Sequence, residues 1–190
     1  LACGSGDGKV RVFDPVAGGE ALLVIDVGEE VSALVFFKDP ATGAPRLVSG
    51  SEDCKLRVFG PVAGGEALVV INVGLPVRAL AVFADPATGA PRLACGCVDE
   101  KVRIYDPVAG GEVLLVLVGH TERVRALTVF EDPATGDLRL ASGSDDNSVR
   151  VWDLAAGGAA LFVHKGHTGW VWALTAFADP ATGETRLVSG

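Results

Sequence analysis

The stretch LASGSDDNSVRVWD, residues 140–153, decides the fold, because the chain contains three further versions of it. These versions are LACGSGDGKVRVFD from Leu1, LVSGSEDCKLRVFG from Leu47 and LACGCVDEKVRIYD from Leu93, and a partial copy, LVSG, occupies residues 187–190. Successive copies begin 46 or 47 residues apart. Self-similarity at a fixed period of this length is typical of solenoids and propellers. The period therefore predicts a single repeat domain over residues 1–190, with repeats starting near residues 1, 47, 93 and 140.

Each period contains four short runs with the character of β-strands. In the last full period they cover residues 124–130, 138–144, 148–153 and 160–164. The run DPATG, first seen at residues 39–43, separates the first two strands, and runs such as DPVAGGE separate the third from the fourth. Pro presets φ and Gly readily adopts positive φ, so both runs predict turns. No stretch shows helical periodicity, and we predict an all-β fold.

Two further segments connect the repeat to a known family. GHTERVRALTVF from Gly119 and GHTGWVWALTAF from Gly166 lie at matching offsets from the copies of the repeated stretch that begin at Leu140 and Leu187. Together with residues 140–153, they resemble the Gly-His and Trp-Asp signatures of the WD-repeat family. The resemblance covers the whole chain and implies a β-propeller built from four-stranded antiparallel blades, with four repeats in this chain. It also implies a non-catalytic scaffold that binds other proteins or peptides.

The resemblance implies a buried chain of hydrogen bonds in one repeat, formed by His120, Ser142, Asp146 and Trp152. An imidazole can donate with one nitrogen and accept with the other, whereas an indole N–H only donates. The other repeats keep the turn Asp but replace the Trp with another aromatic residue: Phe13, Phe59 and Tyr105. We therefore expect those repeats to depend more on apolar packing.

The same residues could suggest a hydrolase, with Ser142 as the nucleophile and His120 as the base. The repeat already accounts for Ser142, His120 and Asp146 and would place them inside a blade rather than in a cleft. We therefore predict that the protein is not an enzyme and has no catalytic residues.

A metal site is the second chemical alternative, built from the cysteines and two histidines: Cys3, Cys54, Cys95, Cys97, His164 and His167. Cys3 and Cys95 align with serines of the other repeats, and so does Cys97. They are interpreted as small strand residues of a reduced protein, so we predict no metal and no cofactor.

The charge and composition limit the possible partners and locations. Lys and Arg number 16 against 24 Asp and Glu, a net charge of −8, which disfavours binding to nucleic acid or to anionic lipid. The apolar runs are too short for a membrane-spanning helix, and no secretion signal is recognisable. Reduced cysteines favour the cytoplasm or the nucleus. The sequence has no Met, so we expect an excised or engineered segment.

In the WD-repeat family, partners commonly dock on the face formed by the loop before the first strand and the turn between the second and third strands. The residues that the resemblance places there are Glu30, Glu52, Arg78, Arg123, Arg125, Asp145, Trp170 and Trp172. Trp170 and Trp172 are two residues apart in an expected strand and would project to the same side. Trp and Arg are enriched in binding hot spots. The alternative is that the two indoles fill a local gap in the packing.

The two ends of the chain are expected to be complementary, because the chain begins and ends within a second strand. Joining residues 171–177 to residues 10–25 would complete a further blade, within one chain or between two. Four wedge-shaped blades would crowd the inner strands, so we predict a homodimer that closes an eight-bladed ring. Two alternatives remain open: a self-assembling structural fragment with no separate ligand, and a piece of a longer polypeptide.

Overall fold

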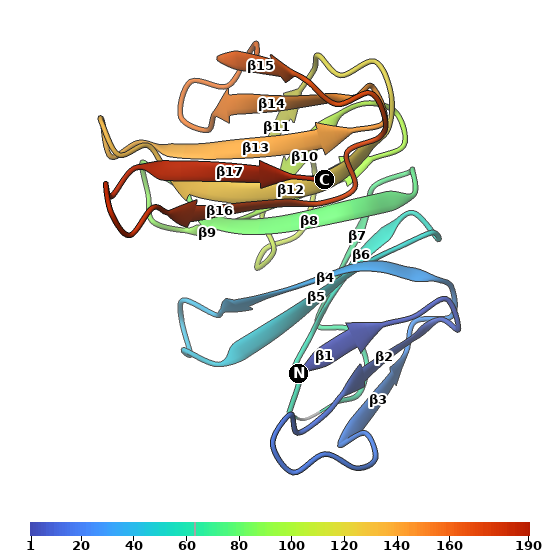
Figure 1. Cartoon of the computed structure of the whole chain (residues 1–190). Helices are drawn as coiled ribbons and strands as arrows, with labels where there is room; N and C mark the ends of the chain where they lie inside the picture. Colours follow the sequence, from blue (N-terminus) through green and yellow to red (C-terminus); the bar gives the residue numbers. More distant parts are fainter. Residues whose placement is uncertain (63) are drawn as a thin grey trace.

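The computed structural model describes residues 1–62 and 64–190. This part of the chain contains seventeen strands arranged in five antiparallel sheets and no helix (Figure 1), which confirms the all-β prediction. Accordingly, the described residues include no helix long enough and apolar enough to cross a membrane.

The sheets follow one another along the chain. Sheet I consists of β1 (Ala2–Gly4), β2 (Lys9–Val12) and β3 (Leu23–Asp26). Sheet II consists of β4 (Val31–Lys38), β5 (Pro45–Ser51), β6 (Lys55–Phe59) and β7 (Val69–Asn72). Sheet III consists of β8 (Val77–Ala84), β9 (Pro91–Cys97), β10 (Val102–Tyr105) and β11 (Leu115–Leu117). Sheet IV consists of β12 (Val124–Glu131), β13 (Leu138–Ser144), β14 (Ser148–Asp153) and β15 (Phe162–Lys165). Sheet V consists of β16 (Leu174–Ala178) and β17 (Thr185–Ser189).

Sheets II, III and IV each have the predicted four antiparallel strands per repeat. β13 and β14 have the expected bounds, whereas β15 begins at Phe162 rather than at residue 160. The DPATG turns form as predicted. In the first of them the Asp39 carboxylate accepts the N–H groups of Ala41 and Thr42, at 3.0 and 3.1 Å, and Gly43 adopts a φ of 68°. Local turn chemistry therefore sets the length of each hairpin.

The core lies between consecutive sheets, because both faces of each four-stranded sheet are apolar. The contacts between sheets repeat with the sequence period: Val10 and Ile25 against Leu47 and Phe59, Leu56 and Ile71 against Leu93 and Tyr105, and Val102 and Leu117 against Leu140 and Trp152. The first strands β4, β8, β12 and β16 also contact one another in succession. Each sheet therefore stabilises the next one, as expected for stacked repeats.

A glycine of each second strand brings neighbouring sheets very close together. A Cβ added at Gly50 would lie 2.6 Å from Cγ1 of Val77, and one added at Gly96 would lie 2.7 Å from Cγ1 of Val124. A Cβ added at Gly143 would likewise come too close to Cγ1 of Val171. Only a residue without a side chain fits at these points, which explains why this glycine recurs in every repeat.

The strand expected at residues 171–177 is shorter in the structure, which is a correction to the prediction. β16 begins at Leu174, so Trp170 and Trp172 precede the strand instead of lying in it. In the other repeats the first strand opens with a pair such as Val31 with Ser51. In sheet V, Ala173 and Gly190 exchange two backbone hydrogen bonds, at 2.9 and 3.1 Å, and the N–H of Trp172 donates to Gly190 at 2.7 Å.

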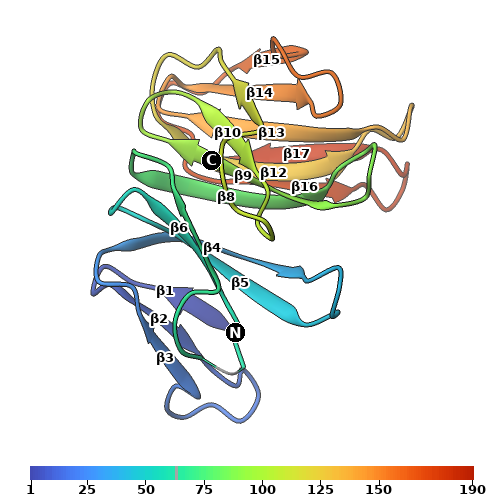
Figure 2. The ribbon, with the colours of Figure 1, turned by 180° about the vertical axis from the view of Figure 1, so that it is seen from behind.

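Sheets I and V do not join within the chain. Among the described strands, β17 pairs only with β16, and β2 pairs only with β1 and β3. The two chain ends lie well apart in Figure 1 and also in the reverse view of Figure 2. Closure of a ring within a single chain is therefore not observed.

The close approach of the sheets can be tested with Gly96→Ala. The added methyl group would collide with Val124, and overpacking of this kind costs about 1–3 kcal/mol. We expect the melting temperature to fall by several degrees in a thermal unfolding experiment followed by circular dichroism. Gly6→Ala is the matched control, because nothing lies within 4 Å of its added Cβ. Equal melting temperatures for the two variants would contradict the packing argument.

Candidate functional site

Four polar side chains meet between sheets III and IV. The Nδ1 atom of His120 lies 2.8 Å from Oδ2 of Asp146, and its Nε2 atom lies 2.7 Å from Oγ of Ser142. The indole N–H of Trp152 donates to the same Ser142 oxygen at 2.8 Å. The structure thus places His120, Ser142, Asp146 and Trp152 in one continuous chain of hydrogen bonds.

Ser148 is a fifth member that the sequence analysis did not identify. Its hydroxyl donates to Oδ1 of Asp146 at 2.6 Å, and the backbone N–H of Thr121 donates to Oδ2 of Asp146 at 3.2 Å. The other repeats have Lys at the Ser148 position, namely Lys9, Lys55 and Lys101. Ser replaces Lys only in the repeat that has all four members of the hydrogen-bond chain. This difference between the repeats could have identified Ser148 from the sequence.

The ionisation of the chain follows from its burial. Desolvation lowers the pKa of His120, against the opposing effect of the Asp146 carboxylate, so the imidazole is neutral at pH 7. Desolvation alone would raise the pKa of Asp146, but hydrogen bonds from Ser148 and His120 outweigh it and lower the pKa to about 2. The imidazole therefore donates from Nδ1 to Asp146 and accepts the Ser142 proton at Nε2.

This arrangement is suited to structure rather than to nucleophilic attack. Ser142 has no exposed surface, and its oxygen also accepts a hydrogen bond from Trp152. A nucleophile needs access to a substrate and a nearby site that stabilises the oxyanion. The buried position of Ser142 provides no such access.

The other repeats satisfy their turn Asp with arginine instead of histidine. Arg57 donates to Asp53 at 2.6 Å, and Arg103 donates to Asp99 at 2.8 and 2.7 Å. Arg11 likewise donates to Asp7, and this bond holds the pKa of Asp7 at about 2. These pairs were missed in the sequence analysis, although the Asp and the Arg recur four residues apart in every repeat. In the repeats without histidine, hydrogen bonds from arginine therefore hold the turn Asp.

A second cluster lies beside β12 and the segment before β16. The guanidinium carbon of Arg125 lies 4.4 Å from the ring centre of Trp172 and 5.6 Å from that of Trp170. The two indole rings are 5.8 Å apart at 50°. Arg125 also forms two hydrogen bonds with the Asp145 carboxylate, at 2.8 and 2.9 Å. The arginine is therefore held simultaneously by a carboxylate and by two aromatic rings.

The remaining expected contact residues lie in the same repeat or at the equivalent loops of the preceding repeats. Arg78 of β8 forms an ion pair with Glu52 in the turn after β5. The side chains of Glu30 and Arg123 are exposed, and their backbone carbonyls accept the N–H groups of Glu52 and Asp145, at 3.0 and 2.9 Å. We call the full set the Trp–Arg face: Glu30, Glu52, Arg78, Arg123, Arg125, Asp145, Trp170 and Trp172.

The side chains of the two tryptophans are open to solvent. Trp170 is 55% exposed and Trp172 is 58% exposed. Rings that filled a gap in the core would be covered, as Trp152 is. The two indole rings are thus accessible at the surface of the described chain.

The cysteines are dispersed through the fold. Cys95 and Cys97 are neighbours on one face of β9, with their sulfur atoms 3.8 Å apart, whereas Cys3 lies in β1 and Cys54 follows β5. The described residues contain no group of three or more His, Cys, Asp or Glu side chains that could hold a metal ion. The Cys95–Cys97 pair is buried between sheets II and III, where it belongs to the apolar core.

In a comparison with protein families, residues 111–153 match the family model described as WD domain, G-beta repeat. Residues 111–153 are therefore similar to a WD repeat. The matched segment runs from the loop before β11 to the end of β14 and includes every residue of the hydrogen-bond chain. A search of the curated proteins found no match. WD repeats generally serve as non-catalytic modules for protein–protein interaction, which agrees with the buried position of Ser142 in this WD repeat.

The contribution of the hydrogen-bond chain to stability can be tested with Ser142→Ala. Loss of the hydroxyl would leave His120 and the indole N–H of Trp152 buried without their partner, which costs about 1–3 kcal/mol. Ser49→Ala is the control, because Ser49 occupies the same position in sheet II and its hydroxyl has no hydrogen-bond partner. We expect urea unfolding to show a clear loss for the first variant and little change for the second. A loss of the same size in both would contradict this account.

The buried imidazole also predicts a pH dependence of stability. The folded state lowers the pKa of His120, so below an unfolded pKa of about 6.5 the unfolded chain binds more protons than the folded one. Stability should therefore fall as the pH decreases from 7 to 5. Melting temperatures across this range should show a shallower slope in His120→Gln than in the parent chain. The exposed His164 provides the control, and His164→Gln should keep the parent slope.

Proposed function

We propose that this WD-repeat chain is a non-catalytic scaffold that binds a protein or peptide through the Trp–Arg face. The observation that carries the proposal is the position of Arg125, which is fixed by Asp145 and covers two tryptophan rings that are each more than half exposed. Trp and Arg are the residue types that most often dominate binding energy at protein interfaces.

The rigidity of this cluster supports binding. A flexible arginine loses side-chain entropy when a partner immobilises it, and this loss weakens the complex. Arg125 has already lost that freedom, because its guanidinium group is held by two hydrogen bonds and stacks on Trp172. A partner that covers the indoles would therefore gain contact area at a small additional entropic cost.

The charges of the face indicate the chemistry of the partner. The two acid–arginine pairs, Glu52 with Arg78 and Asp145 with Arg125, largely neutralise each other. The net charge of −8 disfavours nucleic acid and anionic membranes as partners. A peptide that presents an apolar or aromatic side chain to the indoles and a carboxylate or carbonyl to the exposed Arg123 fits this surface best.

We also propose a reducing compartment, the cytoplasm or the nucleus, as the location. All four cysteines are free, and two of them are buried within 3.8 Å of each other without being bonded. Proteins in oxidising compartments usually carry disulfides instead of free thiols.

The binding proposal can be tested with peptides selected from a displayed random library on the parent chain. For a selected peptide, Trp172→Ala and Trp170→Ala should each weaken the affinity by about 30-fold, as the loss of a hot-spot residue does. Because both side chains are exposed, the melting temperature should change by no more than a degree or two. Phe36→Ala, at another exposed aromatic residue, is the control and should retain affinity. Peptides that bind all three variants equally would show that the Trp–Arg face is not the binding site.

A further inference from the structure

Two thiol groups lie side by side in the interior of sheet III. Cys95 and Cys97 are separated by one residue of β9, so both side chains project from the same face of the strand, and their sulfur atoms are 3.8 Å apart. Both residues are fully buried and belong to the apolar cluster between sheets II and III. The contact between the two thiols is therefore shielded from water.

Paired thiols occur in one repeat only. The equivalent pairs of positions in the other repeats hold at least one serine: Cys3 and Ser5, Ser49 and Ser51, and Ser142 and Ser144. In sheets II and IV the second serine donates to a backbone carbonyl of the loop before the first strand, at 3.4 and 3.0 Å. The sulfur of Cys97 makes its hydrogen bond with Cys95 instead. The cysteines of sheet III thus replace a bond to the backbone with a contact between thiols.

The surroundings of the pair favour a thiolate at Cys97. The hydrogen bond from the Cys95 thiol lowers the pKa of Cys97, against the opposing effect of burial, and the positive charge of Arg103 adds to the lowering. Arg103 lies opposite Cys95 in the sheet and is fixed by two hydrogen bonds to Asp99, at 2.8 and 2.7 Å. The thiol contact and burial raise the pKa of Cys95. Cys97 therefore loses its proton first, and Cys95 remains a thiol.

Cys97 lies at the end of β9, next to a surface turn. It is the last residue of the strand and precedes the turn that contains Asp99. Val73 and Leu75, in the loop before β8, pack against the cluster that contains Cys97. Loops open locally at a lower free-energy cost than the strands of a core. A molecule as small as hydrogen peroxide can reach the sulfur atom during such an opening.

The geometry of the pair permits a disulfide after a small bend of β9. Bonded sulfur atoms lie about 2.05 Å apart, so the two atoms, now 3.8 Å apart, must approach each other by roughly 1.8 Å. Two residues of an extended strand span roughly 6.7 Å, which is near the upper end of the Cα separations found in disulfides. The strand must therefore shorten slightly between the cysteines. The residue there is Gly96, whose backbone can adopt conformations that other residues avoid.

This bend strains the structure, because Gly96 is packed against sheet IV. A Cβ added at Gly96 would lie 2.7 Å from Cγ1 of Val124 and 3.1 Å from its carbonyl oxygen. Movement of the Gly96 backbone therefore disturbs the contact with Val124. A disulfide formed under strain has a more oxidising potential than an unstrained structural one and is more easily reduced. The bond between these cysteines is thus expected to be reversible.

We propose that Cys95 and Cys97 form a reversible redox site, which a hydroperoxide such as hydrogen peroxide oxidises to an intramolecular disulfide. The Cys97 thiolate attacks one oxygen of the peroxide, the O–O bond breaks, and Cys97 becomes a sulfenic acid. The leaving hydroxide takes up the proton that Cys97 had released and forms water. The Cys95 thiol then attacks the sulfenic sulfur, the S–O bond breaks, and a second water molecule leaves with the thiol proton. The two sulfur atoms lose two electrons in total, and the peroxide gains them.

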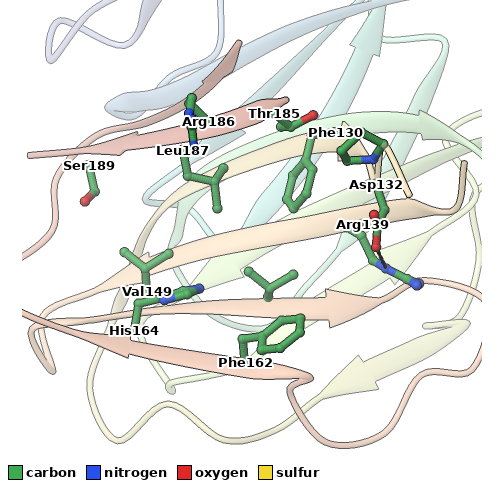
Figure 3. Close-up of a pocket in the computed structure, with 12 residues that line it drawn as sticks. Phe130, Asp132, Arg139, Val149, Phe162, His164, Thr185, Arg186, Leu187 and Ser189 are labelled. Carbon is green, nitrogen blue, oxygen red and sulfur yellow. Dashed lines mark ion pairs between the residues drawn. The ribbon is translucent and has the colours of Figure 1, made fainter. Parts of the chain in front are cut away.

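The redox site is separate from the other surfaces of the chain. Figure 3 shows a groove of about 600 Å³ beside sheet IV, whose lining includes Val149, Phe162 and Leu187. The cysteines face sheet II, on the opposite side of sheet III from sheet IV. The inference therefore goes beyond the proposed peptide binding and does not depend on the Trp–Arg face.

Peptide mapping of the intact chain tests the redox site. The folded chain is treated with equimolar hydrogen peroxide, unfolded in the presence of iodoacetamide and digested with trypsin. Cleavage after Arg92 and Lys101 isolates both cysteines in residues 93–101, LACGCVDEK. This peptide should carry no alkyl group and weigh about 2 Da less than its reduced form, because two hydrogen atoms are lost. Treatment with dithiothreitol before alkylation should restore two alkyl groups.

The chain supplies an internal control and two matched variants. Residues 1–9, LACGSGDGK, contain a single cysteine and should remain alkylated. Cys95→Ser and Cys97→Ser each introduce the residue that sheets II and IV have at that position, so both variants should fold. In Cys95→Ser the sulfenic acid of Cys97 should accumulate and react with dimedone. In Cys97→Ser the thiol of Cys95 should stay unmodified.

Three results would overturn the proposal. The first is two alkyl groups on residues 93–101 after peroxide treatment of the folded chain. The second is a disulfide that joins either cysteine to Cys3 or Cys54, since the 3.8 Å contact would then not direct the reaction. The third is dimedone on Cys95 in Cys97→Ser but none on Cys97 in Cys95→Ser, which would exclude Cys97 as the attacking thiolate.

Discussion

Each sheet of this chain depends on the one beside it, because both of its faces are apolar and only a neighbouring sheet can cover them. The contact is made close by the glycine of every second strand, which allows Val77, Val124 and Val171 to approach the neighbouring backbone. Burial of the aromatic residue at the end of the third strand completes each interface. Stability is therefore shared between neighbours, and a sheet with an uncovered face has apolar area still available for binding.

The polar interactions show how much variation this packing tolerates. The turn Asp after the second strand is bound by histidine in one repeat and by arginine in the others. Either partner satisfies the carboxylate and fixes the turn, but only the histidine links it further to Ser142 and Trp152. The repeat that matches the WD model is thus the one in which the turn is connected to the core by hydrogen bonds.

Much of the fold could be predicted from the sequence, because the period, the turn residues and the alternation of apolar residues all indicate the same strands. The bounds of β13 and β14 agree with the pattern. The error at Trp170 and Trp172 arose because sequence similarity marks a strand by its residue types, whereas the observed strand β16 depends on which backbone groups pair. The Asp–Arg pairs and Ser148 depend on which side chain fills a shared position, and that information is visible only when the repeats are compared residue by residue.

The segment that carries the two tryptophans is held by backbone hydrogen bonds on both sides. The N–H of Trp172 donates to the carbonyl of Gly190 at 2.7 Å, and the N–H of Val171 donates to the carbonyl of Ser144 at 3.1 Å. The backbone beneath the indole rings is therefore fixed in the same way as the guanidinium group of Arg125, which Asp145 holds from the other side. A surface whose backbone and side chains are both restrained before contact loses little entropy when a partner covers it, which is the physical basis for binding at the Trp–Arg face.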